Sequence, residues 1–341
     1  MASRKAVFLY VVFLAGFTTT AFVLLVHVLE YRRLQQLVPP DYLQPDPQAD
    51  FVRKPNTSLQ QPFAEHPAGI LRKQYNNYGF LRHDSTQQQK REGVRRILFT
   101  GDSHTDGLVW NEENFCTLLE DSLHLAGQPA EVLNAGTGYY TFRQYEGVLL
   151  RNLHLQPDDF VVVVYAGNDF VETLFYDFRW YNPLQSLRQF RARLGWRYRY
   201  PVLYNNQSLT QVYYFHLYPF QVQPVINEAL AAVGRMQAIC HRNGIRFHLV
   251  LLPSDFDLLP GYQEKVRLAT GLTSAALAVN TTFSRALAAF CQQLNIPFLD
   301  LALSLQYQSG AYYYPRDHHL NAPGNRVVAQ RLTRYFLQEQ R

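Results

Sequence analysis

The sequence predicts an α/β fold built on a doubly wound parallel sheet. Short apolar segments alternate with amphipathic segments of helical spacing along most of the chain. Four consecutive valines within residues 160–165 are typical of a strand that is buried on both faces. Polar residues able to do chemistry follow the apolar segments, at the strand ends where folds of this class bind their ligands.

Strands and helices are expected in alternation from residue 95 onward. The strands are expected at residues 95–100, 131–133, 160–165, 246–252 and 297–301. The helices are expected at residues 114–125, 145–155, 226–242, 282–294 and 323–338. The first of these helices places Phe115, Leu118, Leu119 and Leu123 at the spacing of one helix face. This alternation predicts a doubly wound parallel α/β sheet.

Composition excludes several classes of protein. Of the 341 residues, 47% are hydrophobic and 17% are charged, which is too apolar for a disordered chain. The mean hydropathy of −0.22 is too low for a protein with many membrane spans. Three distant cysteines form neither a metal-ligand spacing nor a disulfide framework. The net charge of +5 includes no block of basic residues, so no nucleic-acid partner is expected.

The N-terminal segment predicts a transmembrane signal anchor at residues 1–31. Residues 6–29 contain no Asp, Glu, Lys or Arg. As a helix these 24 residues reach about 36 Å, enough to cross a hydrocarbon core of about 30 Å. A cleaved signal peptide is the competing interpretation, but the apolar run is longer than such a peptide needs, and residues 24–29 offer no small-x-small cleavage site.

The flanking charges nearly balance, and the N-terminal amine favours an inside N-terminus. We therefore expect a single-pass cell membrane protein with its catalytic domain outside the cytoplasm, which is the periplasm in a Gram-negative cell. Prolines crowd residues 32–67, which predicts a semi-rigid stalk. A single large domain is then expected over residues 68–341.

Serine chemistry is the reaction that the polar strand-end residues could support. A serine becomes a nucleophile when a neighbouring base accepts its proton and a third group orients that base. Ser103 is the candidate nucleophile, His319 the candidate base and Asp317 the orienting carboxylate, with His318 as the alternative base. The backbone N–H groups of Ser103 and Gly136 and the side-chain amide of Asn168 are the candidate oxyanion donors.

Four sequence blocks in a fixed order carry a family resemblance. They are Gly101-Asp102-Ser103-His104, Asn134-Ala135-Gly136, Gly167-Asn168-Asp169 and Asp317-His318-His319. With these blocks the chain resembles the SGNH (GDSL-like) hydrolase family from about Tyr75 to the C-terminus. The resemblance implies a flavodoxin-like three-layer sandwich, acyl-ester chemistry, no metal and no organic cofactor. It places the family's nucleophile, oxyanion glycine, oxyanion asparagine, histidine and aspartate on Ser103, Gly136, Asn168, His319 and Asp317.

The closing block departs from the common Asp-x-x-His pattern, because Arg316 stands three residues before His319. The Asp317-x-His319 spacing resembles a membrane-anchored bacterial branch that includes polysaccharide acetyl-modifying members. We therefore expect a serine esterase or acyltransferase acting through an acyl-enzyme on O-acyl, chiefly acetyl, esters of extracytoplasmic carbohydrate, with a membrane-bound acyltransferase as a candidate partner. A lipid esterase at the membrane surface and a non-catalytic subunit of a polysaccharide-modifying complex are the alternatives.

An insertion at about residues 171–222 is rich in aromatic and basic residues. Residues 170–220 hold sixteen aromatic residues, and residues 178–227 contain no Asp or Glu. Leu184, Leu187, Phe190 and Leu194 follow helical spacing, with arginines largely off that stripe. Three interpretations stay open: a lid helix packed on the sheet, membrane contact through residues 184–199, and docking of a partner.

Overall fold

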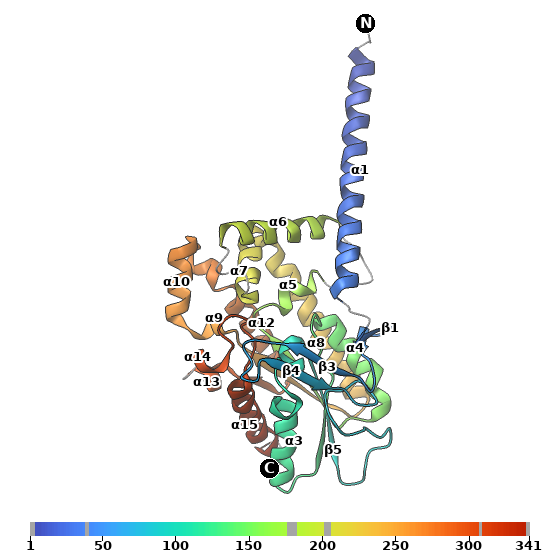
Figure 1. Cartoon of the computed structure of the whole chain (residues 1–341), viewed down its shortest axis with the longest axis vertical. Coiled ribbons are helices and arrows are strands. Elements are labelled where there is room, and N and C mark those ends of the chain that lie inside the picture. The colour runs from blue at the N-terminus through green and yellow to red at the C-terminus, as the bar shows by residue number, and fades with distance from the viewer. Residues whose placement is uncertain (1–3, 38–40, 176–182, 201–205, 307–308, 339–341) are drawn as a thin grey trace.

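The computed structural model describes residues 4–37, 41–175, 183–200, 206–306 and 309–338. A long helix, α1 (Arg4–Leu37), stands out from a globular domain and carries the N-terminal end of the chain (Figure 1). Within α1, residues Arg4–Leu25 are long and apolar enough, by length and composition, to cross a membrane. This helix agrees in position with the expected anchor.

A five-stranded parallel sheet forms the centre of the domain, in the spatial order β6-β5-β7-β8-β9. Its strands are β5 (Arg95–Gly101), β6 (Ala130–Asn134), β7 (Asp159–Tyr165), β8 (Arg246–Leu252) and β9 (Phe298–Asp300). All five lie where the apolar segments predicted them, within two residues at each end. The predicted α/β fold with a parallel sheet is confirmed.

Helices cover both faces of the sheet and give the domain three layers. On one face lie α3 (Phe115–Leu125) and α15 (Ala322–Gln338); on the other lie α4 (Phe142–Asn152), α8 (Val222–Arg242) and α12 (Val279–Gln293). Successive side chains of a strand point to opposite faces. Val161 and Val163 therefore enter the core beneath α3 and α15, while Val162 and Val164 enter the other core. This explains why β7 is apolar at nearly every position.

Short helices occupy the loops at the carboxyl ends of the strands and between the larger helices. They are α2 (Ser103–Asp106), α5 (Asp169–Thr173), α9 (Asp255–Leu258), α10 (Pro260–Thr270), α11 (Ser274–Leu277), α13 (Ala302–Leu305) and α14 (Ser309–Tyr312). Three short segments form 3₁₀ turns, at Asn111–Glu113, Leu153–Leu155 and Pro219–Gln221. Isolated antiparallel bridges pair Tyr75 with Leu81 and Tyr313 with Leu320.

The stalk predicted at residues 32–67 is wrong for most of its length. Residues 32–37 continue α1, and two antiparallel hairpins follow. The hairpins pair β1 (Leu43–Asp46) with β2 (Asp50–Arg53) and β3 (Ser58–Pro62) with β4 (Ile70–Gln74). Phe51 and Val52 are buried in the core shared with α4, so the domain begins well before residue 68. Prolines are tolerated in such edge strands and turns; Pro39 and Pro40 lie outside the described residues.

The insertion folds into two helices, α6 (Pro183–Arg199) and α7 (Gln207–Leu217). Many of its aromatic side chains join the main core, including Trp196, Tyr213 and Tyr214. The apolar stripe beginning at Leu184 faces away from the domain rather than onto it. A lid packed through that stripe is therefore wrong. Residues 176–182 and 201–205 of the insertion, with Arg179, lie outside the described residues.

Candidate active site

Ser103 lies at the sharp turn between β5 and α2. A side chain on Gly101 would press on Thr105 and on the carbonyl oxygen of Val163, so only glycine fits at the end of this strand. The Asp102 side chain accepts a hydrogen bond from the backbone N–H of His104 at 2.9 Å and caps the helix. Ser103 is the first residue of α2, where backbone N–H groups have no acceptor within the helix.

His319 and Asp317 come from the loop before α15 and meet Ser103 there. The His319 Nε2 atom lies 2.7 Å from Ser103 Oγ, and its Nδ1 atom lies 2.5 Å from Asp317 Oδ1. The residue between them, His318, adopts a left-handed backbone conformation with φ of 68°. This turn lets two side chains only two positions apart converge, so the Asp-x-His spacing still forms a hydrogen-bonded chain of three residues.

The charge environment of His319 suits a proton acceptor. Burial of the ring disfavours its charged form, but the hydrogen bond and the charge of Asp317 outweigh burial, so the pKa of His319 is raised above 6.5. Burial acts in the opposite direction on Asp317, yet the contact with His319 lowers the pKa of its carboxyl group. Asp317 therefore stays ionised and can hold the proton of His319 on Nδ1, which leaves Nε2 facing the serine.

The structure places the other candidate oxyanion residues differently. Asn168 is buried beside the site, and its Nδ2 group donates to Gln207 Oε1 at 3.1 Å. Gly136 departs from its predicted role, because its backbone N–H donates to Asn134 Oδ1 at 2.9 Å. A Cβ atom on Gly136 would lie 2.7 Å from Thr105 Cβ, so this glycine allows close packing against α2. Gly138 is the glycine of this loop that lies against Ser103, because a Cβ atom on it would lie 3.7 Å from Ser103 Cβ.

Two more histidines lie near the triad in separate settings. His318 Nδ1 lies 2.6 Å from Asp255 Oδ2, and no hydrogen bond joins His318 to Ser103 in the described residues, so its alternative role as the base is not supported. The buried ring of His104 lies between the rings of Tyr165 and His319, with centroid distances of 3.7 Å and 4.4 Å. Burial lowers the pKa of His104 well below its usual value, so this ring is neutral beneath His319.

Two buried carboxylates hold the loops around the site. Asp169 Oδ2 accepts hydrogen bonds from the hydroxyl of Tyr145 at 2.8 Å and the backbone N–H of Tyr165 at 2.9 Å. Burial raises the pKa of Asp102 to about 6 and that of Asp169 well above its usual value. Their principal contacts are with the protein backbone and Tyr145, which gives both residues a structural role.

The N-terminal hairpins contribute contacts that the sequence did not reveal. The Phe63 ring packs edge-on against Tyr314 at 5.0 Å, and Glu65 accepts a hydrogen bond from the backbone N–H of Arg316 at 2.9 Å. Both contacts brace the loop that carries Asp317 and His319. The only signal in the sequence was the apolar residue Phe63 within a proline-rich segment, which is too weak to predict a long-range contact.

A buried charge cluster supports the other end of α2. Asp106 forms ion pairs with Arg53 and with Lys73, the latter at 2.9 Å, and accepts a hydrogen bond from the hydroxyl of Tyr75 at 3.1 Å. Burial lowers the pKa of Lys73 to about 8 although Asp106 opposes this effect. Burial alone would raise the pKa of Asp106, but Arg53 and Lys73 lower it. The cluster fixes the nucleophile helix to β2 and β4.

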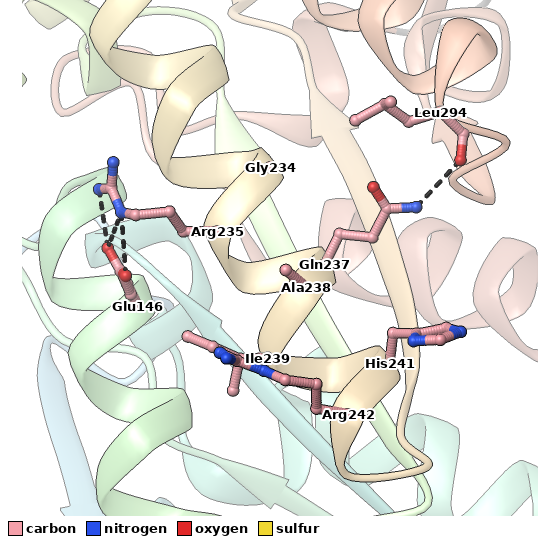
Figure 2. A pocket seen from close by; sticks show the side chains of 9 residues that line it. All are labelled: Glu146, Gly234, Arg235, Gln237, Ala238, Ile239, His241, Arg242 and Leu294. Carbon is pink, nitrogen blue, oxygen red and sulfur yellow. Dashed lines mark hydrogen bonds and ion pairs between the residues drawn. The ribbon is translucent and has the colours of Figure 1, made fainter.

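The pocket drawn in Figure 2 lies away from this site. It has a volume of about 620 Å³ and is bordered by the ion pair of Glu146 with Arg235 and by Leu294. Its α8 residues precede β8, and Leu294 precedes β9, so it lies towards the amino ends of these strands. Ser103 follows the carboxyl end of β5 and therefore belongs to the opposite edge of the sheet. In the described parts of the chain, no three His, Cys, Asp or Glu side chains are grouped to hold a metal ion.

A parallel α/β sandwich with a Ser-His-Asp arrangement at the carboxyl ends of its strands defines a serine hydrolase class. Residues 99–327 match the GDSL-like Lipase/Acylhydrolase family, and the chain belongs to this family. It is accordingly an SGNH-type esterase or acylhydrolase. Comparison with curated proteins found no significant match.

Solved structures similar to this chain include three proteins of low sequence identity. An acetyl xylan esterase shares 16% identity with a TM-score of 0.44, covering 70% of this chain and 98% of the other. A catalytic mutant of an acetylxylan esterase from Geobacillus stearothermophilus shares 11% with a TM-score of 0.43, covering 70% and 93%. A GDSL-like lipase from Bacteroides thetaiotaomicron shares 15% with a TM-score of 0.38, covering 72% and 89%.

Proposed function

We propose that this chain is a membrane-anchored serine esterase or acyltransferase that acts on O-acetyl esters of extracytoplasmic carbohydrate. The observation that carries the proposal is the 2.7 Å contact between Ser103 Oγ and His319 Nε2, with Asp317 on the other ring nitrogen. A serine hydroxyl at this distance can pass its proton to the histidine as it attacks a carbonyl carbon.

In the first half of the reaction, Ser103 Oγ forms a bond to the ester carbonyl carbon and His319 Nε2 takes the hydroxyl proton. The backbone N–H of Ser103 and the amide of Asn168, once it leaves Gln207, donate to the resulting oxyanion. The bond to the alcohol oxygen then breaks, and His319 returns the proton to that oxygen. Acylated Ser103 remains.

In the second half, water or a sugar hydroxyl attacks the acyl group. His319 removes the proton of the attacking oxygen and returns it to Ser103 Oγ as the acyl bond breaks. Water as the attacking group gives an esterase, and a sugar hydroxyl gives an acyltransferase. In the transferase case, a membrane-bound acyltransferase is the proposed partner that supplies the acyl group.

Polar groups around the triad support a carbohydrate ester as substrate. Asn168 and Gln207 form a 3.1 Å hydrogen bond with each other, and Asn168 also interacts with Asp102, the neighbour of Ser103. Amide groups of this kind form hydrogen bonds with hydroxyl-bearing ligands. The buried Asn168 Oδ1 atom has no partner within the described structure, and a substrate hydroxyl would satisfy it.

The nucleophile is tested with para-nitrophenyl acetate and the full chain in detergent. Ser103→Ala is expected to lower kcat by roughly 10³-fold or more, because the acyl-enzyme cannot form. Ser122→Ala is the matched control, since its hydroxyl only donates to the Leu118 carbonyl within α3. Equal rates for Ser103→Ala and the parent would contradict the proposal, and a fluorophosphonate probe that labels the parent but not Ser103→Ala would support it independently.

Substrate class and membrane side need separate measurements. Release of acetate from O-acetylated polysaccharide, compared with transfer of acetyl to a deacetylated acceptor glycan, distinguishes esterase from transferase. Protease added to intact cells, to cells with a permeabilised outer membrane and to lysed cells reports the side of the domain. Digestion only after the inner membrane is opened would contradict an extracytoplasmic domain.

A lipid esterase at the membrane surface is the second candidate, favoured by the exposed apolar residues of α6. It predicts faster hydrolysis of long-chain esters in vesicles than of soluble acetyl esters. A non-catalytic subunit is the third alternative, and the Ser103-His319 contact is the observation against it. Persistent absence of hydrolysis and of probe labelling in a folded protein would favour that alternative.

A further inference from the structure

The helix α6 has two faces of opposite character, and its apolar side chains lie on the outer one. The face that packs on the domain consists of Gln185, Gln189, Ala192 and Trp196. Gln185 donates to the hydroxyl of Tyr214 at 2.6 Å. The helix is thus held to α7 through the Gln185–Tyr214 hydrogen bond and the packing of Trp196 on Tyr213.

The outward face carries the larger aliphatic and aromatic side chains. Leu184, Phe190 and Leu194 leave 64%, 52% and 42% of their surface exposed, and Leu187 and Tyr198 are exposed as well. Their spacing of three or four residues forms one continuous stripe along the helix. A surface helix normally turns such a stripe inward, so an outward stripe marks an interaction surface.

The position of α6 next to α1 indicates what covers the stripe. The two helices contact each other, and α6 lies crosswise to α1 beside its domain-proximal part (Figure 1). A helix crosswise to a membrane-spanning helix lies parallel to the membrane plane. The exposed apolar side chains of α1 over Arg4–Leu25 suit a hydrocarbon environment, and α6 contacts the same helix towards its domain-proximal end.

Charge agrees with this placement. Arg188, Arg191, Arg193, Arg197 and Arg199 lie on α6, and no acidic residue does. Arginines beside an apolar stripe suit the interface between anionic headgroups and acyl chains. At about 1.5 Å per residue, the 17 residues of α6 would lie along about 26 Å of that interface.

We propose that α6 is an interfacial helix that rests its outward stripe on the anionic lipid bilayer into which α1 inserts. The inference rests on the proposed anchoring by α1 and is independent of the reaction. It also orients the active site. Through α7, whose first residue Gln207 contacts Asn168, α6 turns the carboxyl edge of the sheet towards the membrane surface.

The test uses the full chain in vesicles of phosphatidylcholine and phosphatidylglycerol, with single introduced cysteines carrying a polarity-sensitive dye. The native Cys116, Cys240 and Cys291 are buried and serve as an unreactive background. Phe190→Cys and Leu194→Cys are expected to emit at shorter wavelength and to be quenched by lipids that carry a shallow spin label. Leu125→Cys, at a side chain 90% exposed on α3, is the water-exposed control and is expected to show neither effect.

A fourth labelled variant separates the interfacial helix from the anchor. Leu14→Cys lies within α1 and reports its insertion through quenching by deep spin labels. Quenching at 14 without quenching at 190 and 194 would overturn the interfacial helix and leave the anchor intact. Absence of quenching of the dye at Leu14→Cys by the deep spin labels would contradict the membrane insertion of α1. A blue-shifted dye at positions 190 and 194 that returns to a water-exposed spectrum at one protein copy per vesicle would identify a second copy of the chain as the occupant and overturn the proposal. A blue-shifted dye at these positions without quenching by the spin-labelled lipids would point to another protein as the occupant and would also overturn the proposal.

Discussion

Replacing Asp317 with asparagine removes one charge from the chain of hydrogen bonds that ends on Ser103. Asp317 Oδ1 lies 2.5 Å from His319 Nδ1, and this contact raises the pKa of His319 against the effect of burial. Asparagine has nearly the same shape but can present an N–H to the ring. His319 would then carry its proton on Nε2 and could not accept the proton of Ser103.

The magnitude follows from the contact that is lost. A hydrogen bond to a charged group contributes about 1.5–3 kcal/mol, which corresponds to a factor of about 10–150 in rate. The wrong tautomer adds to this loss and reaches about 10⁴-fold in serine proteases. Asp317 keeps 31% of its side chain exposed, so water can partly replace its role. We therefore expect kcat/KM of Asp317→Asn to fall roughly 10²–10³-fold.

The pH profile gives a second, independent measurement. His319 acts as a base only when neutral, so kcat/KM of the parent should fall as the pH drops through the raised pKa of His319. Asp317→Asn removes the two largest interactions that raise this pKa and leaves burial, which lowers it, opposed only by the weaker charge effect of Asp102. The acidic limb of the residual activity should therefore move to lower pH.

Para-nitrophenyl acetate hydrolysis across the pH range measures both effects. Asp121→Asn is the matched control, because it makes the same chemical change at an exposed position of α3 and should leave the profile unchanged. A loss below about tenfold would refute the hydrogen-bond argument. An acidic limb that stays in place or moves upward would refute the assignment of the limb to His319.

Two further predictions concern stability, measured as the free energy of unfolding in denaturant. Gly147→Ala should destabilise the protein by about 1–3 kcal/mol, because the new Cβ atom meets the Gln48 backbone of the N-terminal hairpin. In the control Gly234→Ala, the new Cβ atom meets only the Phe290 ring at 3.6 Å, so this variant should be neutral or stabilising. Equal effects of the two substitutions would mean that the hairpin does not pack on α4. Asp106→Asn should destabilise by about 3–5 kcal/mol, since it leaves two buried cations without their carboxylate. A loss below about 1 kcal/mol, the effect of an exposed pair, would contradict the burial of this ion-pair cluster.

The strands of the central sheet were predictable because burial on both faces leaves mostly apolar residues. β7 is the clearest case, since its valines enter two different cores. The hairpins before residue 75 were not predictable for the opposite reason. β3 reads Ser-Leu-Gln-Gln-Pro with no buried residue. Its partner β4 reads Ile-Leu-Arg-Lys-Gln and places a lysine at one of its two buried positions, so local composition indicated a spacer. Their docking on the domain depends on contacts with residues far along the chain, such as the bond from the Tyr140 hydroxyl to the Phe51 carbonyl.

The sequence offered Ser103, His319 and Asp317 as candidates, while their mutual positions were not predictable from it. Ser103 and His319 are 216 residues apart, and only the parallel order of the strands brings them within 2.7 Å. Gly136 shows the limit of motif reasoning. Its place in the second block matched an oxyanion glycine, but the acceptor for its N–H is decided by the neighbouring Asn134 side chain.

By itself, the sequence determined the elements whose residues are buried in a regular pattern and the residue types that could do the chemistry. The spacing of apolar residues along the chain depends on how many faces of a helix or strand are buried, so it predicted the sheet and most of its helices. It does not record what covers them. Leu184 and Leu194 predicted an amphipathic helix, yet only the packing of α6 on α7 through Gln185 and Trp196 decided that these leucines face outward. The same holds for the site, because hydrogen-bond partners depend on distances that the chain acquires only when it folds.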